Sequence, residues 1–233
     1  MLIIFDLDDT LIDTSSSIVP LKLDEAFTRM LEEGMVVEDE EASRLELKRL
    51  NAASPSAKEA LAEFVEINQL SKKFLDIALH EVYENFSEDM PVFALKGAIE
   101  ITKELSLDHD LAMVTAGVEK HQKFKIRKSG LEPSCFRKII VCSSGEKKRF
   151  YQKLLEESGY HEKDVLVCGD RIAVDLSPAK ELGFHTVQIL CGRGMYAAGN
   201  KNDVDHTITE LSQLKTIIQN FSDVLPTKIG KSW

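Results

Sequence analysis

The N-terminal stretch MLIIFDLDD restricts the fold of this chain more than any other segment. Residues 1–5 form an unbroken apolar run, which is typical of a strand covered on both faces. Asp6, Asp8 and Asp9 follow at once, so the sequence predicts a buried strand whose carboxyl end carries acidic groups. Side chains alternate along an extended chain, and we therefore expect Asp6 and Asp8 to point the same way.

Two interpretations account for carboxylates this close together. Like charges destabilise each other unless a proton or a cation relieves the repulsion, and carboxylate and carbonyl oxygens suit Mg²⁺. The alternative is a strand that runs into an Asp-rich turn, with Thr10 as a hydroxyl cap for the next segment.

From residue 91 onward, short apolar runs alternate with amphipathic segments. Strands are predicted at 110–115, 138–142, 165–169 and 185–190, with a short edge strand at 205–208. Helices are predicted at 96–105, 119–129, 147–158, 174–182 and 210–220. Continuous apolar strands that alternate with helices indicate an α/β fold, a Rossmann-like core of three layers with a parallel sheet. The polar tail, 222–233, is expected to be loosely held.

The segment between residue 15 and residue 86 has no strand signals and many helical ones. Apolar residues at helical spacing predict helices at about 21–31 and 38–50. A longer helical stretch is predicted at 57–86, with a break near Ser71. The sequence therefore predicts an all-helical insert directly after the first strand.

Composition excludes several classes of function. The net charge of -10 argues against a nucleic acid or an anionic membrane as partner, but it allows a small phosphorylated substrate. The four cysteines lack the paired spacing of a zinc site, and we expect reduced thiols in a cytoplasmic protein. Residues 1–5 lack the basic region of a signal peptide. Monomer and homodimer are both compatible with the sequence.

Sites in open parallel sheets form beyond the carboxyl ends of the strands, and the predicted topology brings several polar residues to that edge. These residues are Asp6, Asp8, Thr115, Lys147, Lys148, Asp170 and Asp175. Acids that hold Mg²⁺ beside a lysine and a threonine match a phosphoryl group, whose charged oxygens need cations and hydrogen-bond donors.

Four motifs along the chain resemble those of the haloacid dehalogenase-like hydrolase superfamily. They are FDLDDTL at 5–11, MVTAG at 113–117, the Lys147/Lys148 region, and VCGDRIAVD at 167–175. The helical insert resembles a cap of the C1 type, which this superfamily carries after its first motif. The resemblance implies a core domain at 1–14 and 90–233, and a helical cap domain at 15–89.

The resemblance also implies roles for individual residues. Asp6 would be the nucleophile that forms an aspartyl-phosphate, and Asp8 the general acid and base. Mg²⁺ would be held by Asp6, the Asp8 carbonyl and Asp170, with Asp175 as a further ligand or as an acceptor behind the ligands. Substrate phosphate would be held by the Thr115 hydroxyl, by Lys147, and by backbone amides near Leu7 and Ala116. Lys148 stays an alternative to Lys147.

The implied function is a Mg²⁺-dependent phosphatase that hydrolyses a small phosphomonoester, such as a sugar phosphate or a nucleotide. One alternative is a sugar-phosphate mutase or another phosphotransferase of the same superfamily, and another is a non-catalytic binding module. A dehalogenase has no leaving oxygen to protonate, so the acid at Asp8 argues against that branch.

Overall fold

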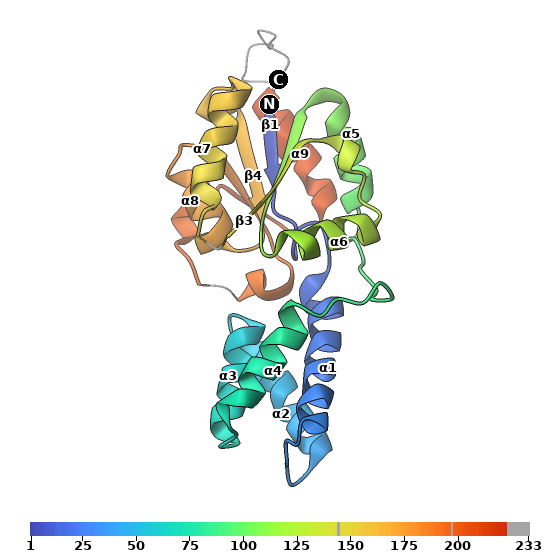
Figure 1. The fold of residues 1–233 in the computed structure, drawn as a ribbon. Coiled ribbons are helices and arrows are strands. Elements are labelled where there is room, and N and C mark those ends of the chain that lie inside the picture. The colour runs from blue at the N-terminus through green and yellow to red at the C-terminus, as the bar shows by residue number, and fades with distance from the viewer. Residues whose placement is uncertain (144, 197, 223–233) are drawn as a thin grey trace. The chain divides into compact units, whose positions relative to one another are not determined.

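The computed structural model describes residues 1–143, 145–196 and 198–222 (Figure 1). The described residues divide into two compact units, one of Met1–Asp13 with the residues from Val92 onward and the other of Thr14–Pro91. We call them the core unit and the helical unit. Among the described residues, no helix is both long enough and apolar enough to cross a membrane. The tail predicted at 222–233 begins at the last residue of the helix Leu214–Ser222, and its other residues, 223–233, lie outside the described part of the chain.

A six-stranded parallel sheet organises the core unit, with strand order β3-β2-β1-β4-β5-β6. The strands are β1 Leu2–Phe5, β2 Asp110–Ala116, β3 Phe136–Cys142, β4 Val165–Gly169, β5 His185–Ile189 and β6 His206–Ile208. The first strand lies at the centre, where Leu2 pairs with Asp110 on one side and with Val165 on the other. The short strand predicted at 205–208 is present at the sheet edge, beside β5. The predicted parallel α/β fold is therefore confirmed.

Helices cover both faces of the sheet, which explains why its strands are apolar throughout. They are α5 Ala98–Asp108, α6 Glu119–Ser129, α7 Lys147–Ser158, α8 Ser177–Lys180 and α9 Leu214–Ser222. Leu2 and Ile4 of β1 belong to one cluster with Tyr151 and Leu154 of α7. Ile3 and Phe5 are equally buried, and the alternation of side chains along a strand turns them to the opposite face of the sheet.

The helix predicted at 174–182 differs from the observed one. A π-helical turn at Ile172–Leu176 comes first, and only the short α8 continues it. The turn is closed by hydrogen bonds from the Asp175 amide to the Arg171 carbonyl and from the Arg171 amide to the Asp175 carboxylate. A search for α-helical spacing of apolar residues therefore does not detect the first residues of this segment, because they are π-helical. Turns of this kind often occur at functional sites.

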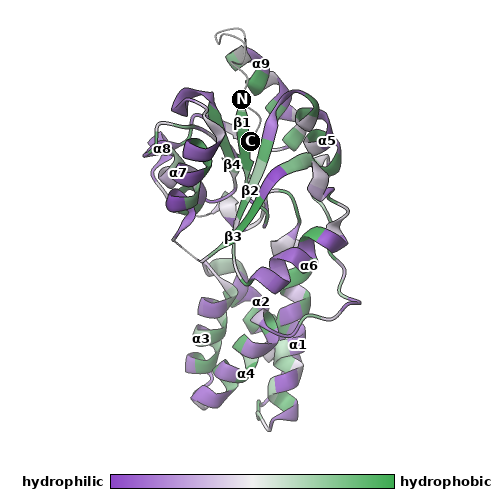
Figure 2. Ribbon diagram, turned by 45° about the horizontal axis from the view of Figure 1, so that its top comes forward, coloured by the Kyte–Doolittle hydropathy of each residue, from purple (hydrophilic) through white to green (hydrophobic). Residues whose placement is uncertain are grey.

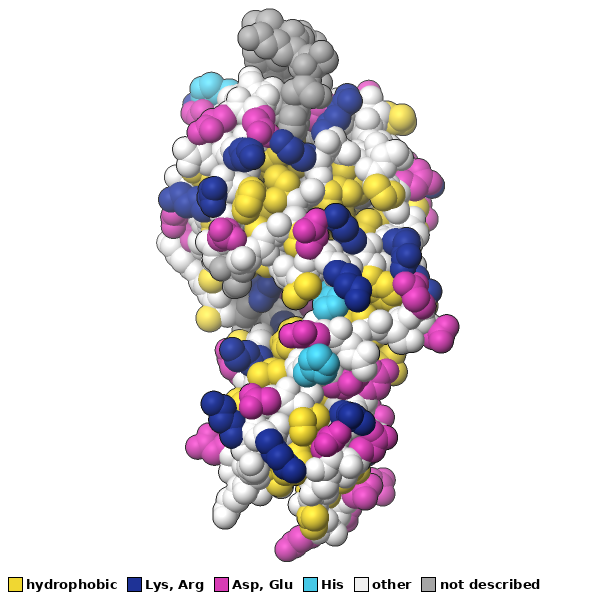
Figure 3. All heavy atoms as spheres, viewed as in Figure 1, with side chains coloured by type: hydrophobic (Ala, Val, Ile, Leu, Met, Phe, Trp, Pro, Cys, Tyr) yellow, Lys and Arg dark blue, Asp and Glu magenta, His cyan; other side chains and the backbone are white. Residues whose placement is uncertain are grey.

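In the helical unit, a π-helical turn at Thr14–Ile18 precedes four α-helices, α1 Val19–Glu32, α2 Glu40–Ala53, α3 Ala57–Ile67 and α4 Lys72–Tyr83. Each presents an apolar stripe to a shared core that includes Phe27 and Phe64 (Figure 2). Acidic and basic side chains intermix over its outer surface on the face shown in Figure 3. The break expected near Ser71 is present, because Gln69 takes a φ of 50° between α3 and α4.

One lysine is buried in the helical unit, and three oxygens surround it. The Nζ atom of Lys22 lies 2.5 Å from Glu25, 2.9 Å from Glu81 and 2.6 Å from the carbonyl of Asn85. An ammonium has three hydrogens to donate, so each can be satisfied inside the unit. This network links α1 to α4 and to the chain that follows α4.

Candidate active site

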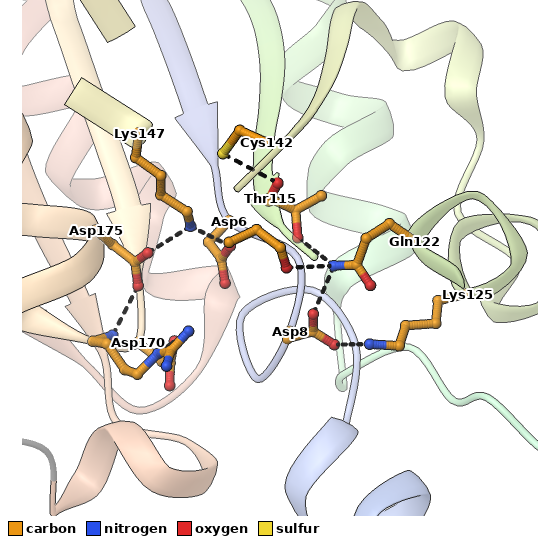
Figure 4. A network of polar contacts seen from close by, with 11 residues as sticks. Asp6, Asp8, Thr115, Gln122, Lys125, Cys142, Lys147, Asp170 and Asp175 are labelled. Atoms are coloured by element: carbon orange, nitrogen blue, oxygen red, sulfur yellow. Dashed lines mark hydrogen bonds and ion pairs between the residues drawn. The ribbon is translucent and has the colours of Figure 1, made fainter. Parts of the chain in front are cut away.

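The residues predicted for the site come from the ends of three strands, the start of one helix and the π-helical turn (Figure 4). Asp6 follows β1, Thr115 lies near the end of β2, and Asp170 follows β4. Lys147 is the first residue of α7 and Asp175 lies in the π-helical turn. The carboxyl edge of the parallel sheet thus gathers side chains that are far apart in the sequence.

A tight turn after β1 separates the first two acids. The Leu7 carbonyl accepts hydrogen bonds from the amides of Leu11 at 2.9 Å and Ile12 at 3.0 Å, and Asp9 has a φ of 56°. Few residues other than glycine adopt this backbone conformation, but aspartate is among those that tolerate it best. The Asp8 carboxylate lies toward α6, where Gln122 contacts it (Figure 4). The expectation that Asp6 and Asp8 point the same way stays a prediction.

Three buried carboxylates form a compact group at the sheet edge. Asp6, Asp170 and Asp175 each offer one oxygen, and these three oxygens all lie within 4.8 Å of one another. The Oδ1 atom of Asp170 is buried and has no hydrogen-bond partner among the described residues. Its nearest cation is Arg171, whose Nε lies 4.0 Å away, too far for a hydrogen bond.

The electrostatics of this group show strong repulsion between its buried carboxylates. Burial, together with the nearby Asp175 and Asp6 charges, raises the pKa of Asp170 to about 9. Burial also raises the pKa of Asp6 to about 6, although the Lys147 ammonium opposes the shift. Carboxylates that are buried this close together are stable in ionised form only beside a cation. A hard divalent ion prefers oxygen ligands, so it would fit this group of carboxylate oxygens, including the Asp170 Oδ1 that has no hydrogen-bond partner among the described residues.

Lys147 lies inside the site and Lys148 does not. The Nζ atom of Lys147 is 2.5 Å from Asp6 Oδ1 and 2.6 Å from Asp175 Oδ1, and only 1% of the side chain is exposed. Burial alone would lower the pKa of Lys147, but the Asp175 and Asp6 carboxylates raise it well above its ordinary value. Lys148 is half exposed and pairs with Glu181 at 2.5 Å.

Both carboxylate oxygens of Asp175 are engaged by the chain itself. Oδ1 accepts from Lys147, and Oδ2 accepts from the backbone amide of Arg171 at 3.0 Å. A Cβ at Gly169 would lie 2.6 Å from the Asp175 Cβ, so this close packing requires glycine at the end of β4. Asp175 is therefore held in place from two sides.

Two polar residues that sequence analysis did not single out contact Asp8. Gln122 donates from Nε2 to Asp8 Oδ2 at 2.8 Å and to the Thr115 hydroxyl at 2.5 Å. Lys125 lies with Nζ 2.7 Å from Asp8 Oδ1. The available signal was their spacing, because residues three apart share one face of the predicted helix at 119–129. Leu7 and Ala116 lie at the same sheet edge, and the roles of their amides stay predictions.

Comparison with known proteins gives related sequences. A family model described as haloacid dehalogenase-like hydrolase matches residues 3–189. A glyceraldehyde 3-phosphate phosphatase from Methanocaldococcus jannaschii is 29% identical over 227 residues, covering 94% of this chain and 96% of the relative. A glyceraldehyde 3-phosphate phosphatase from Pyrococcus furiosus is 28% identical over 228 residues, covering 93% of this chain and 92% of the relative.

Solved structures share the fold. The HAD-hydrolase YfnB from Bacillus subtilis, bound to magnesium, has a TM-score of 0.65 at 19% identity, covering 93% of this chain and 97% of that one. A HAD phosphatase from Thermococcus onnurineus has a TM-score of 0.61 at 18% identity, with 93% and 97% coverage. The family model spans most of the chain, and the four motifs lie within the matched residues. This protein belongs to the haloacid dehalogenase-like hydrolase family.

Proposed function

We propose that this hydrolase is a Mg²⁺-dependent phosphatase that removes phosphate from a small sugar phosphate or a similar metabolite. The observation that carries the proposal is the group of three buried carboxylates with an orphaned Asp170 oxygen, beside a lysine that contacts Asp6. The relatives compared above are named as glyceraldehyde 3-phosphate phosphatases, which makes a three-carbon sugar phosphate the first substrate to test.

In the first step, Asp6 attacks phosphorus and an aspartyl-phosphate forms while the bond to the leaving oxygen breaks. Lys147 holds Asp6 Oδ1 and offsets the negative charge that gathers on the transferring group. Asp8 gives its proton to the leaving oxygen. It then takes a proton from the water whose oxygen attacks phosphorus, and Asp6 is released. The Thr115 hydroxyl and the amides of Leu7 and Ala116 hold the phosphoryl oxygens.

Asp6, Asp170 and the Asp8 carbonyl are the groups that would hold the ion. YfnB, which shares the fold, is bound to magnesium, so Mg²⁺ is the first metal to test. Asp175 does not bind the ion itself but accepts hydrogen bonds that position the groups around it, since Lys147 and the Arg171 amide already donate to its two oxygens. When bound, magnesium supplies positive charge to the phosphoryl oxygens. The helical unit, Thr14–Pro91, is the proposed cap that selects the substrate.

Phosphate release tests the proposal. The protein is assayed with glyceraldehyde 3-phosphate and with p-nitrophenyl phosphate, in Mg²⁺ and after removal of metal by a chelator. We expect release with both esters in Mg²⁺, loss of release with chelator, and loss of release in Asp6→Asn.

A matched control is Asp108→Asn, which removes an exposed carboxylate at the end of α5 and should retain activity. Metal-independent release, or full activity in Asp6→Asn, would contradict the proposal. Transfer of phosphate between sugar hydroxyls without release of inorganic phosphate would instead identify a mutase.

A further inference from the structure

Helix α6 buries four polar side chains, although most of its lysines are exposed. They are His121, Gln122, Lys125 and Ser129, and two of them, Gln122 and Lys125, contact the proposed site. Gln122 is 2% exposed and Lys125 is 9% exposed. Burying an amide and an ammonium costs free energy unless both are hydrogen-bonded. Both groups are directed at the same carboxylate, that of Asp8 (Figure 4).

The amide of Gln122 bridges two groups of the proposed mechanism. Its Nε2 faces Asp8 Oδ2 at 2.8 Å, Thr115 Oγ1 at 2.5 Å and the Ala116 carbonyl at 3.3 Å. A carbonyl can only accept, which places the amide nitrogen rather than its oxygen on this side. Because the Thr115 oxygen accepts from Gln122, the Thr115 hydroxyl hydrogen can be donated to a phosphoryl oxygen.

Lys125 holds the other oxygen of the same carboxylate. Its Nζ lies 2.7 Å from Asp8 Oδ1, while Gln122 holds Oδ2. Two donors on two different oxygens fix both the position and the rotation of the carboxylate plane. After Asp8 has given up its proton, the Lys125 ammonium also balances the carboxylate charge.

We propose that Gln122 and Lys125 are positioning residues that aim Asp8 at the leaving oxygen, and that Gln122 also orients the Thr115 hydroxyl. The proposal rests on the phosphatase function proposed above. In that reaction the P–O bond to the leaving group breaks as the Asp6–P bond forms, and the Asp8 proton goes to the leaving oxygen. A small misplacement of a reacting group can cost about 100-fold in rate, so α6 would control the step without touching the substrate.

Leaving-group dependence separates this role from a structural one. p-Nitrophenolate departs as a stable anion and needs no proton, whereas the alcohol of glyceraldehyde 3-phosphate must be protonated as it leaves. We compare kcat/KM for both esters in wild type, Gln122→Met and Lys125→Met. General acid catalysis is worth about 100-fold to 10,000-fold, so we expect a loss at least about tenfold larger with glyceraldehyde 3-phosphate than with p-nitrophenyl phosphate.

Three further variants serve as controls. Lys123→Met removes an exposed lysine of the same helix, one that pairs with Glu119, and should leave both kcat/KM values unchanged. Lys125→Arg keeps a cation near Asp8 and should restore most of the activity. Gln122→Glu keeps the side-chain volume but repels Asp8, and should show the same selective loss as Gln122→Met. If either Met variant fails to fold by circular dichroism, Gln122→Glu and Lys125→Arg decide the question.

Equal losses with both esters, or no loss with either, would overturn the positioning role while leaving the phosphatase function intact. If wild type releases phosphate from neither ester, the proposed function itself fails and this inference falls with it.

Discussion

At the scale of single residues, Asp170 provides the strongest argument for the proposed cation. Its carboxyl group is buried, its Oδ1 lacks a hydrogen-bond partner among the described residues, and its pKa is raised to about 9. The folded, metal-free chain therefore retains a proton that the unfolded chain releases near the ordinary pKa of 3.8. This retained proton means that the metal-free protein loses stability as pH rises from about 4 to about 9.

Asp170→Asn removes the charge without changing the size of the side chain. We predict that at pH 7 the metal-free variant unfolds at a higher temperature than wild type, and that its stability depends less on pH. We also predict loss of stabilisation by Mg²⁺, which in wild type amounts to about 2.7 kcal/mol at 100 times Kd. Thermal unfolding with chelator and with Mg²⁺ measures both effects.

Asp205→Asn is the matched control for Asp170→Asn. Asp205 accepts from Lys180 and from the Thr186 amide, and hydrogen bonds of this kind lower its pKa against the effect of burial. This variant should lose stability and keep its Mg²⁺ response. An Asp170→Asn protein that Mg²⁺ still stabilises would contradict the assigned ligand.

The adjacent lysines allow a second comparison at this scale. Lys147 is buried between Asp6 and Asp175, whereas Lys148 is half exposed and pairs with Glu181. Lys147→Met should lower kcat about 100-fold or more, the usual effect of removing a group that stabilises transition-state charge. Lys148→Met should keep kcat near wild type, because exposed ion pairs contribute little. Steady-state kinetics checks both, and equal effects would refute the distinction.

The sequence predicted which residue types lie at the sheet edge, but not how each side chain is directed. Asp6, Thr115, Lys147 and Asp170 follow from strand ends and helix starts. Gln122 and Lys125 do not, because the inward face of a largely polar helix depends on how that helix packs. The contacts of Asp8 with Gln122 and Lys125 were likewise not visible in the pattern of the first motif.

At the scale of elements, the π-helical turn at Ile172–Leu176 places Asp175 against Gly169, the last residue of β4. Its close packing leaves no room for a side chain at Gly169, where a Cβ would lie 2.6 Å from the Asp175 Cβ. A Cβ atom is fixed by the backbone and cannot rotate away, so the clash can be removed only if the turn or the end of β4 moves. The spacing of apolar residues predicted the strand before this turn correctly, but it did not predict the turn itself.

Gly169→Ala should therefore shift the turn, with consequences for both stability and catalysis. We expect a loss of about 1–3 kcal/mol from overpacking, together with a lower kcat because Asp175 no longer holds Lys147 in place. Chemical denaturation and phosphate-release assays measure the two effects.

The matched control for Gly169→Ala is Gly159→Ala, at the end of α7. Gly159 has a φ of 68° and open space around its Cβ position. Alanine there should cost about 1–2 kcal/mol through backbone strain and leave kcat unchanged. A Gly169→Ala enzyme with wild-type kcat would show that the turn adapts.

At the scale of the whole molecule, the helical unit is an insertion whose two connections lie side by side in the core unit. The Asp13 amide donates to the Phe93 carbonyl at 2.9 Å, and the Leu95 amide donates to the Leu11 carbonyl at 2.9 Å. Strand signals stop after residue 12 and resume beyond residue 91, which is why the insertion could be recognised from sequence. Which substrate the helical unit selects depends on a few side chains, and helical periodicity carries no information about them.

Since the two connections are adjacent, a short Gly-Ser linker in place of residues 14–91 should close the core unit without strain. We predict that this shortened protein unfolds cooperatively and is still stabilised by Mg²⁺. It should hydrolyse p-nitrophenyl phosphate but discriminate poorly between sugar phosphates. Circular dichroism and a panel of phosphate esters provide the measurements, and a shortened chain without cooperative unfolding would show that the core unit depends on the insertion.

The central claim is that Asp6 carries the phosphoryl group during turnover, and covalent trapping tests it most directly. In Asp8→Asn, p-nitrophenyl phosphate should still phosphorylate Asp6, because its leaving group needs no proton, while hydrolysis slows for lack of the base. Peptide mass spectrometry after rapid quenching should then find a phosphoryl group on Asp6, formed only in Mg²⁺. A phosphoryl group on another residue, or steady turnover with Asp6 unmodified at every time point, would contradict the account.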